Sequence, residues 1–304
     1  MKVLLAIDTS LASKYVVDEA GARPWPAETV FSVVNVVDLQ PFAKLPALID
    51  DARREGQKVV KAAAETLSRS GHKTNYESFV GFAKNGIAEY AKQWGADLLM
   101  AGSHGQGALK RFLLGSVAQG ILRTAPCSVE IVRPSSHGSP ASSHSLKIML
   151  ATDGSEFSVA AANSIASRPW PKGSQVKIVS AMEFIVLNNQ IPGYPLSPAC
   201  PPSVIEELMD NARTHAKEAV ETARKILAAA KLNVVDGEAT PLGDPRSIVL
   251  DEAKKWGADL IVMGSHGRRG FDRMMLGSIS ESVAIHAHCS VEVIRTPQRE
   301  RADN

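Results

Sequence analysis

Short apolar runs alternate with longer amphipathic stretches along the chain, and the first half sets the pattern. Strands are predicted at the apolar runs 3–7, 30–37, 76–80, 98–101 and 128–132. Helices are predicted at 50–70, 84–94 and 116–124, and a further helix follows Asp8, with Thr9 or Ser10 as its N-cap. Strands that alternate with helices indicate a parallel sheet with helices on both faces.

The second half repeats this order of elements. Its predicted strands and helices lie at 147–152, 175–182, 203–230, 234–239, 246–256, 260–263, 278–287 and 290–294. Short motifs recur too: Arg23-Pro24-Trp25-Pro26 matches residues 168–171 at an offset of 145, and Cys127-Ser128-Val129-Glu130 matches residues 289–292 at an offset of 162. A repeat of this length is the size of one ordinary domain. The sequence therefore predicts two tandem α/β domains, each a Rossmann-like, doubly wound parallel sheet of five strands.

The boundary between the halves has almost no apolar residues. Residues 135–145 are rich in serine, proline and glycine, which predicts a flexible linker between a domain at 1–134 and a domain at 146–297. The rise in offset from 145 to 162 is a net insertion of 17 residues in the second half. We place it at 184–202, where prolines exclude a helix and predict a loop, either a lid over a ligand or a packing element.

Composition narrows the classes of protein. Hydrophobic residues make up 44% and charged residues 22%, as in ordinary globular proteins, and the net charge of +2 gives no broad basis for nucleic-acid binding. No apolar run approaches the ~18 residues that span a membrane, and the N-terminus does not have the pattern of a signal peptide, so we expect a cytoplasmic protein. Cys127 and Cys289 have no partners at metal-ligand spacing and are interpreted as core residues.

Glycines recur at one fixed spacing in both halves. Gly102-Ser103-His104-Gly105 is followed by nine residues and Gly115-Ser116, and Gly264-Ser265-His266-Gly267 by nine residues and Gly277-Ser278. In each half the motif follows one predicted strand, and an aspartate ends another. Ligands of doubly wound sheets bind beyond the carboxyl ends of the strands, so these elements are expected to converge on one crevice per half.

This motif suits a phosphate group. The glycines would allow a tight turn and leave room for a ligand, and the following helix would present free N–H groups and the positive end of its dipole. There is neither a P-loop nor a Gly-x-Gly-x-x-Gly after the first strand. Two plainer interpretations stay open: the glycines could serve turns alone, and Asp8 and Asp153 could only cap the helices that follow them.

Basic and histidine side chains lie close to the motifs. The histidines, His104 and His266, are interpreted as loop residues, because a catalytic histidine needs a nucleophile or carboxylate within reach. The basic residues of the two spacers either screen phosphates or are solvated surface charges; they are Lys110, Arg111, Arg268, Arg269 and Arg273.

The motif Gly-x2-Gly-x9-Gly-Ser, with an aspartate after the first strand, resembles the ATP-binding class of universal stress proteins, once in each half. The resemblance implies a tandem two-domain member that binds ATP, possibly with Mg²⁺, and acts in stress response or regulation. It also implies that the halves pair through their last strands as a pseudo-dimer, and a homodimer of chains is compatible with it. The residues it assigns to the nucleotide are Asp8, Val36, Gly102, Gly105, Gly115, Ser116 and Val117 in the first half and Asp153, Ala181, Gly264, Gly267, Gly277, Ser278 and Ile279 in the second.

Two departures from the family pattern predict unequal sites. Gly243-Asp244-Pro245 matches the Gly-x-Pro that often precedes the third helix, whereas Gly81-Phe82-Ala83 does not. Ala181 is smaller than the usual valine, which weakens apolar packing on the base. The sequence presents no evident general base or metal-ligand cluster, so we do not expect efficient catalysis. The alternatives are a slow Mg²⁺-dependent ATPase or phosphotransferase that uses the same sites, and a nucleotide-independent interaction module.

Overall fold

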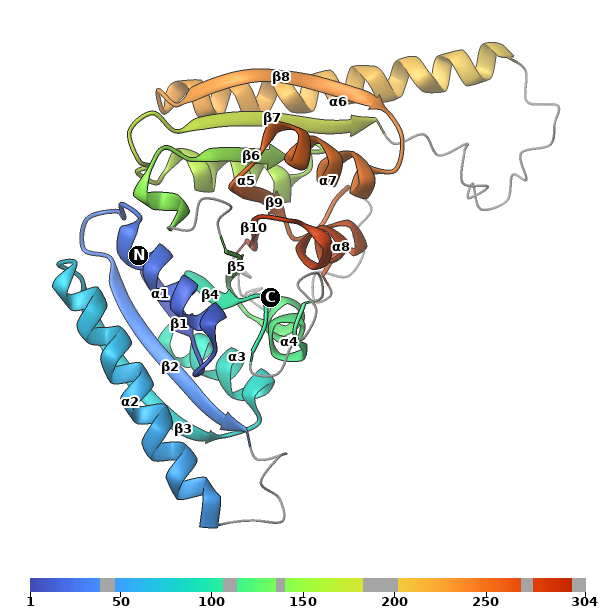
Figure 1. Ribbon diagram of the computed structural model, residues 1–304. Helices are drawn as coiled ribbons and strands as arrows, with labels where there is room; N and C mark the ends of the chain where they lie inside the picture. The colour runs from blue at the N-terminus through green and yellow to red at the C-terminus, as the bar shows by residue number, and fades with distance from the viewer. Residues whose placement is uncertain (39–46, 106–113, 135–139, 183–201, 269–275, 297–304) are drawn as a thin grey trace, which may run out of the picture.

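The computed structural model describes residues 1–38, 47–105, 114–134, 140–182, 202–268 and 276–296 (Figure 1). Its strands join into one ten-stranded sheet with the order β3-β2-β1-β4-β5-β10-β9-β6-β7-β8. The first half contributes β1 (Lys2–Ala6), β2 (Val30–Asp38), β3 (Lys73–Gly81), β4 (Leu98–Gly102) and β5 (Ser128–Val132). The second half contributes β6 (Lys147–Ala151), β7 (Gln175–Met182), β8 (Asn233–Leu242), β9 (Leu260–Gly264) and β10 (Ser290–Ile294).

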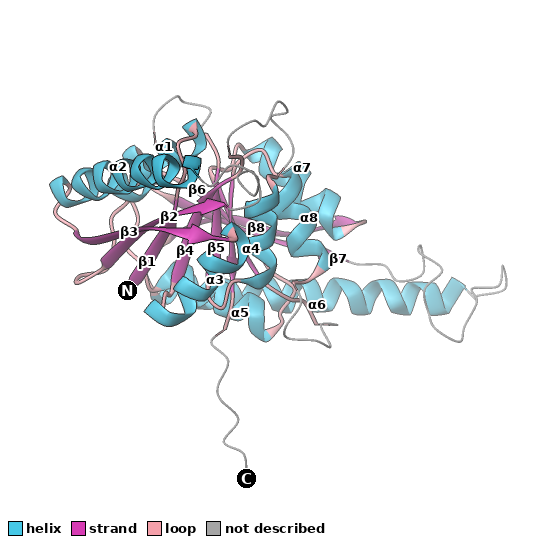
Figure 2. Ribbon diagram, turned by 90° about the horizontal axis from the view of Figure 1, so that it is seen from below, coloured by secondary structure: helices cyan, strands magenta, loops and turns pink. Residues whose placement is uncertain are grey.

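Helices cover both faces of the sheet. In the first half, α1 (Leu11–Ala22) and α2 (Ala47–Arg69) lie on one face, and α3 (Ala83–Trp94) and α4 (Ser116–Thr124) on the other (Figure 2). The second half repeats this arrangement with α5 (Glu156–Ala166), α6 (Pro202–Ala229), α7 (Pro245–Trp256) and α8 (Ser278–His286). Within the described ranges, no helix has both the length and the apolar composition needed to cross a membrane.

The apolar core on one face is shared by the two halves. It runs under α3, α4, α7 and α8 and includes Val129 of β5 and Val291 of β10, both fully buried. On the opposite face, two separate cores lie under α1 and α2 and under α5 and α6. Burying one large apolar side chain contributes about 1.5–3 kcal/mol, so the shared core is a large part of what joins the halves.

The strands within each half are parallel, as the sequence predicts. Strand order reverses between β1 and β4 and again between β6 and β9, which is the doubly wound arrangement. The largest differences from the predicted boundaries are that α2 begins at Ala47 rather than at 50, β3 begins at Lys73 rather than at 76, and β8 ends at Leu242 rather than at 239. The first five residues of β3 are exposed or half-buried, because β3 is an edge strand that is defined by its backbone pairing with β2 rather than by apolar side chains.

The two segments predicted to be loops are described only in part. Pro202, the last residue of the predicted insertion, is instead the first residue of α6, a position where proline is tolerated. The remainder of the insertion, and with it the lid hypothesis, lies outside the described residues. In the predicted linker, residues 140–145 include the 3-10 turn η2 (Ala141–Ser143). Ser142 of this turn is buried, and its amide and hydroxyl both donate to the carboxylate of Glu19. This part of the linker is therefore packed against the first domain.

The last strands of the two halves pair directly, as the resemblance implies. β5 and β10 run antiparallel, with Glu130 opposite Glu292, and all residues of both strands are buried. The pairing removes two exposed strand edges and makes one mixed sheet from two parallel ones.

An arginine just beyond each of these strands reaches the other half. Arg133 donates to the carbonyl oxygens of Ala284 at 2.6 Å and Ile285 at 3.2 Å, at the end of α8. Arg295 donates to those of Leu122 at 2.8 Å and Arg123 at 3.1 Å, at the end of α4. Both cations lie at helix C-termini, where they satisfy orphan carbonyls and interact favourably with the dipole. Burial lowers the pKa of Arg133 to about 10, so this arginine still carries its charge at neutral pH.

The pairing of β5 with β10 predicts a contrast in hydrogen exchange. We expect the hydrogen-bonded amides of β5 and β10 to exchange only through global unfolding, because both strands are buried on both faces. The edge strand β3 provides the internal control, and its outward amides should exchange orders of magnitude faster. Exchange along β5 and β10 as fast as along β3 would show that the halves separate without unfolding.

Candidate functional site

The strand-end aspartate and the glycine motif lie together in both halves. β1 pairs with β4, with Ala6 opposite Ala101, so the chain leaves both strands at the same edge of the sheet. A Cβ built on Gly105 would lie 3.0 Å from Asp8 Oδ2, and one on Gly267 would lie 2.8 Å from Asp153 Oδ2. The second glycine of each motif therefore faces the aspartate so closely that a side chain there would displace the carboxylate.

Hydrogen bonds at the start of the next helix hold each aspartate. Asp8 Oδ1 accepts from the amide of Ser10 at 2.9 Å and from the hydroxyl of Ser13 at 2.7 Å. Asp153 Oδ1 accepts from the amide and hydroxyl of Ser155 at 3.0 and 2.6 Å. The N-caps themselves are Ser10 and Ser155, so helix capping does not account for the aspartates.

The second oxygen of Asp153 also has a partner, whereas the first-half counterpart of that partner, Gln106, lies outside the described residues. Asp153 Oδ2 accepts a 2.9 Å hydrogen bond from the backbone amide of Arg268, which follows the motif of the second half. Ser280 of α8 makes a further contact at the motif of the second half: its hydroxyl donates to the carbonyl of Gly264, the last residue of β9, at 2.8 Å. The position equivalent to Ser280 in the first half is Ala118, which has no hydroxyl.

The first glycine of each motif is required for a different reason than the sequence suggested. A Cβ on Gly102 would lie 2.8 Å from Ala12 Cβ, and one on Gly264 would lie 2.7 Å from the carbonyl carbon of Phe157. These glycines allow α1 and α5 to pack closely on β4 and β9. The described glycines with positive φ all lie outside the motifs, so the motif glycines are required for close packing rather than for a left-handed backbone.

The third glycine of each motif begins a helix. The amides of Gly115 and Gly277 each donate to the carbonyl of the motif serine, Ser103 or Ser265, at 2.8 Å. Both glycines are N-caps, and no side chain in the described parts of the chain makes a capping hydrogen bond there. The first-turn amides of α4 and α8, at Ser116-Val117 and Ser278-Ile279, therefore have no partner within their own helix, and Ser116 and Ser278 are exposed. Such a helix start is a site for an anion.

The predicted base positions lie on the neighbouring strands. Val36 of β2 and Ala181 of β7 are both half-buried near the carboxyl ends of their strands. Asn35 was not among the predicted site residues. Its side-chain amide donates to the Ile7 carbonyl at 2.9 Å, and its side-chain oxygen accepts from the Ser78 hydroxyl at 3.3 Å. A buried asparagine within an apolar strand is a signal that could have identified it. Its counterpart at the offset of 145 is Ser180.

The remaining candidates have simpler roles. The Nδ1 atoms of His104 and His266 lie 2.8 and 3.0 Å from the hydroxyls of the neighbouring serines, so each ring has a hydroxyl within hydrogen-bond distance, and the interpretation as loop residues stays a prediction. Arg268 is exposed, whereas Lys110, Arg111, Arg269 and Arg273 lie outside the described residues. Burial raises the pKa of both Cys127 and Cys289 to about 12, which fits core thiols. Among the described residues, no group of three or more His, Cys, Asp or Glu could hold a metal ion.

Comparison with known proteins agrees with the duplication. A family model described as "Universal stress protein family" matches residues 1–133 and 145–295. A protein of Mycolicibacterium smegmatis with the name universal stress protein is 27% identical over 96% of both chains, and one of Methanocaldococcus jannaschii is 35% identical over 41% of this chain and 76% of its own. The crystal structure of a protein of that name from Archaeoglobus fulgidus covers 98% of this chain and 97% of its own, with a TM-score of 0.66 and 20% identity, so it supports the fold.

Proposed function

The chain belongs to the universal stress protein family, with one family domain in each half, and we propose on that basis that each half binds one molecule of ATP. In this proposal the protein acts in stress response or regulation through nucleotide-dependent conformation or partner binding. Mg²⁺ would accompany the phosphates, held by the nucleotide itself rather than by a cluster of protein ligands.

One observation carries the proposal. In both halves a strand-end aspartate, a glycine loop and a helix start without a side-chain cap meet at one edge of the sheet. The family resemblance assigns the aspartates, Asp8 and Asp153, to the nucleoside and Val36 and Ala181 to adenine. The amides at the start of α4 and α8, with the serine hydroxyls, are suited to the phosphates, because they combine free donors with the positive end of a helix dipole.

The proposal includes a difference between the two sites. In the first half, Asp8 Oδ2 faces Gly105, and valine stands at the base position. In the second half, Asp153 Oδ2 already accepts from the amide of Arg268, and alanine stands at the base position. We therefore propose weaker binding in the second half, since the nucleoside would pack against a smaller side chain there.

Calorimetry with ATP tests the number of sites. We expect about two sites per chain of unequal affinity, with Asp8→Asn weakening the tighter one and Asp153→Asn the weaker one, each by about tenfold or more, because a hydrogen bond to a charged group is lost. Asp251→Asn changes an exposed aspartate of α7 and serves as the matched control.

The nucleotide released from the purified protein should be identified by mass spectrometry. Recovery of ATP would support the proposal, and a chain that neither retains nor titrates any nucleotide would contradict it. A stoichiometry near one, unchanged by Asp8→Asn, would show that the first half does not bind. Steady release of ADP from added ATP would assign slow hydrolysis to the same sites.

A further inference from the structure

A short series of contacts leads from the glycine motif of the first half to a helix of the second half. The amide of Ser103, within the motif, donates to the carbonyl of Val132 at 3.2 Å. The next residue, Arg133, donates to the carbonyls of Ala284 and Ile285 in the last turn of α8. Because α8 begins at the proposed phosphate site of the second half, the motif of one half is connected to the helix that would hold the ligand of the other.

The repeat makes the same contacts in the opposite direction. The amide of Ser265 donates to the carbonyl of Ile294 at 2.9 Å. The next residue, Arg295, donates to the carbonyls of Leu122 and Arg123 in the last turn of α4. Helix α4 has nine residues, so about 14 Å separate this end from the start of the helix, the proposed phosphate site of the first half. Each half therefore holds the far end of the helix that would bind phosphate in the other half.

The backbones of the two arginines are held in place as well. The amide of Arg133 donates to the hydroxyl of Ser290 at 3.0 Å, and the amide of Arg295 donates to the hydroxyl of Ser128 at 3.2 Å. Each serine is the buried first residue of the last strand of the other half. Since close-packed interiors transmit strain, a shift of α4 or α8 is passed on through these contacts.

Within each half, the motif and the helix start are bonded to one another. The amide of Gly115 donates to the carbonyl of Ser103, and the amide of Gly277 donates to the carbonyl of Ser265. A phosphate group at the start of either helix would therefore order both that helix and the motif beside it. A ligand in one half thus acts on two connections to the other half, one at the end of its helix and one beyond its motif.

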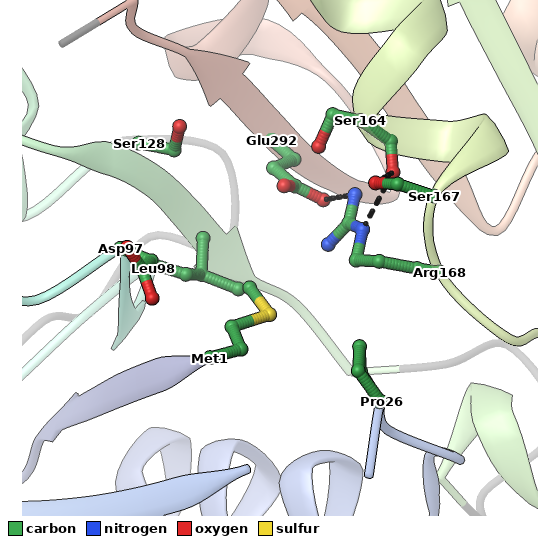
Figure 3. Close-up of a pocket in the computed structure, with 9 residues that line it drawn as sticks. All are labelled: Met1, Pro26, Asp97, Leu98, Ser128, Ser164, Ser167, Arg168 and Glu292. Carbon is green, nitrogen blue, oxygen red and sulfur yellow. Dashed lines mark hydrogen bonds and ion pairs between the residues drawn. The ribbon is translucent and has the colours of Figure 1, made fainter. Parts of the chain in front are cut away.

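A different set of contacts lies on the opposite face of the sheet. A cavity of about 270 Å³ lies between the halves there, and Figure 3 shows Arg168 at its wall, bonded to Glu292 and to the carbonyl of Ser164. These three residues belong to the second half, at the end of α5 and on β10. The core under α5 is separate from the core under α4 and α8. A substitution of Arg168 therefore changes the junction of the halves without removing the contacts of Arg133 and Arg295.

We propose that the two nucleotide sites are coupled through Arg133 and Arg295, so that ATP bound in one half raises the affinity of the other half for ATP. This coupling rests on the proposed function, because it regulates the same two sites. A ligand that orders the helix and motif of one half also orders those of the other through the arginines, so the second ligand has less to order. Coupling between sites usually changes affinity by about 5–150-fold, and by linkage the factor is the same in both directions.

Calorimetry with ATP measures the coupling factor. Val36→Asp and Ala181→Asp each place a carboxylate at one proposed base position and should leave one site per chain. The factor is the product of the two association constants of the unchanged protein divided by the product of the two single-site constants, and we expect about five or more. A factor of one in a chain that binds two molecules of ATP would overturn the coupling and leave the proposed function intact. A chain that binds no ATP would contradict the proposed function itself.

Hydrogen exchange gives a second measurement, with only one site occupied. In the Val36→Asp chain, ATP should bind in the second half only and yet slow the exchange of the amides of α4 in the first half. In the Ala181→Asp chain, ATP should slow the exchange of the amides of α8 in the same way. Protection confined to the half that holds the nucleotide would overturn the coupling.

Replacing both arginines by methionine identifies the residues responsible. The chain with Arg133→Met and Arg295→Met should still bind two molecules of ATP, but with a coupling factor near one. Slow hydrogen exchange along β5 and β10 would show that its halves remain paired. Lysine at both positions keeps a cation at each helix end and should restore part of the coupling. Full coupling in the methionine variant would overturn the role of the arginines.

Two control variants should keep the coupling factor of the unchanged protein. Arg123→Met removes the exposed ion pair with Glu281, which also joins α4 to α8, but it leaves the main-chain carbonyl that accepts from Arg295. Arg168→Met removes the ion pair with Glu292 on the opposite face of the sheet. Coupling lost as fully in Arg168→Met as in the methionine variant would show that it depends on the packing of the halves in general, which would overturn the assignment to Arg133 and Arg295.

Discussion

Replacing Arg23 by methionine is expected to lower the free energy of unfolding by about 3–5 kcal/mol, because two buried carboxylates lose their cation. Arg23 lies between Glu130, which is fully buried, and Glu19, which is nearly so. Burial favours neutral arginine, but Glu130 and Glu19 outweigh it and raise the pKa of Arg23. The cation is therefore held by its partners, and its removal leaves them uncompensated. Urea denaturation of both proteins measures the difference.

Arg168→Met is the matched control for this prediction, because it leaves only Glu292 without its ion-pair partner and should cost less. The pH dependence supplies a second check. Burial tends to raise the pKa of Glu19, but Arg23 and the hydrogen bonds of Ser142 outweigh it and hold this pKa below its usual value of 4.5.

The lowered pKa of Glu19 decides in which direction the free energy of unfolding changes with pH. In the unchanged protein, Glu19 contributes stability that is present above pH 4.5 and is lost as the pH falls through its lowered pKa. In the variant, burial without the cation raises both carboxylate pKa values, and protonation relieves the penalty. The stability difference should therefore narrow as the pH is lowered from neutral toward 4.5. A loss that stays the same across this range would contradict the role given to the charges.

Gly264→Ala is expected to destabilise the second domain by about 1–3 kcal/mol, the usual cost of forcing a methyl group into a packed interior. The new Cβ would lie 2.7 Å from the carbonyl carbon and 2.8 Å from the carbonyl oxygen of Phe157, which are backbone atoms and cannot rotate away. Helix α5 must shift off β9, and Asp153 at its start shifts with it. We expect the melting temperature to fall and the stoichiometry of ATP in calorimetry to drop toward one.

Gly81→Ala is the control for this substitution, since its new methyl group would meet only Val36 Cγ1 at 3.9 Å, an ordinary contact. It should leave the melting temperature nearly unchanged. If Gly264→Ala proved equally mild, the close packing of α5 on β9 would not be the reason for glycine at this position.

The apolar strands of the sheet could be located from sequence with little error. The predicted bounds of β5, β7 and β10 agree with the structure, because buried parallel strands are continuous apolar runs bounded by polar turns. The polar start of β3 could not be located in this way, since an edge strand is held by backbone hydrogen bonds that leave no mark on the side-chain pattern. The recurring glycine spacing located the candidate sites, but it did not reveal that Gly102 and Gly264 are needed for helix packing.

The buried ion-pair cluster of Arg23, Glu19 and Glu130 was not predicted. The sequence showed only that the motifs around Arg23 and Glu130 recur in the second half. Arg23 and Glu130 are 107 residues apart, and each stands in one of the short motifs that recur in both halves. They meet because β5 is in the middle of the ten-stranded sheet, where Glu130 lies under the end of α1. A pattern of apolar positions carries no information about such a contact between charged residues. The role of Glu19 therefore becomes visible only when Arg23 is seen beside it.

The antiparallel pairing of β5 with β10 has a consequence for how the protein responds to dilution. In a dimer of identical subunits, such a sheet would dissociate below a threshold concentration, and twofold symmetry would keep every residue the same on both sides. Here both strands belong to one chain, so their association is intramolecular and independent of protein concentration. Because no symmetry operator relates the two halves, each half can accept substitutions separately. An example is Ser164, which stands where the first half has Glu19. Covalent duplication thus gives a single chain the means to evolve two functions from one ancestral surface.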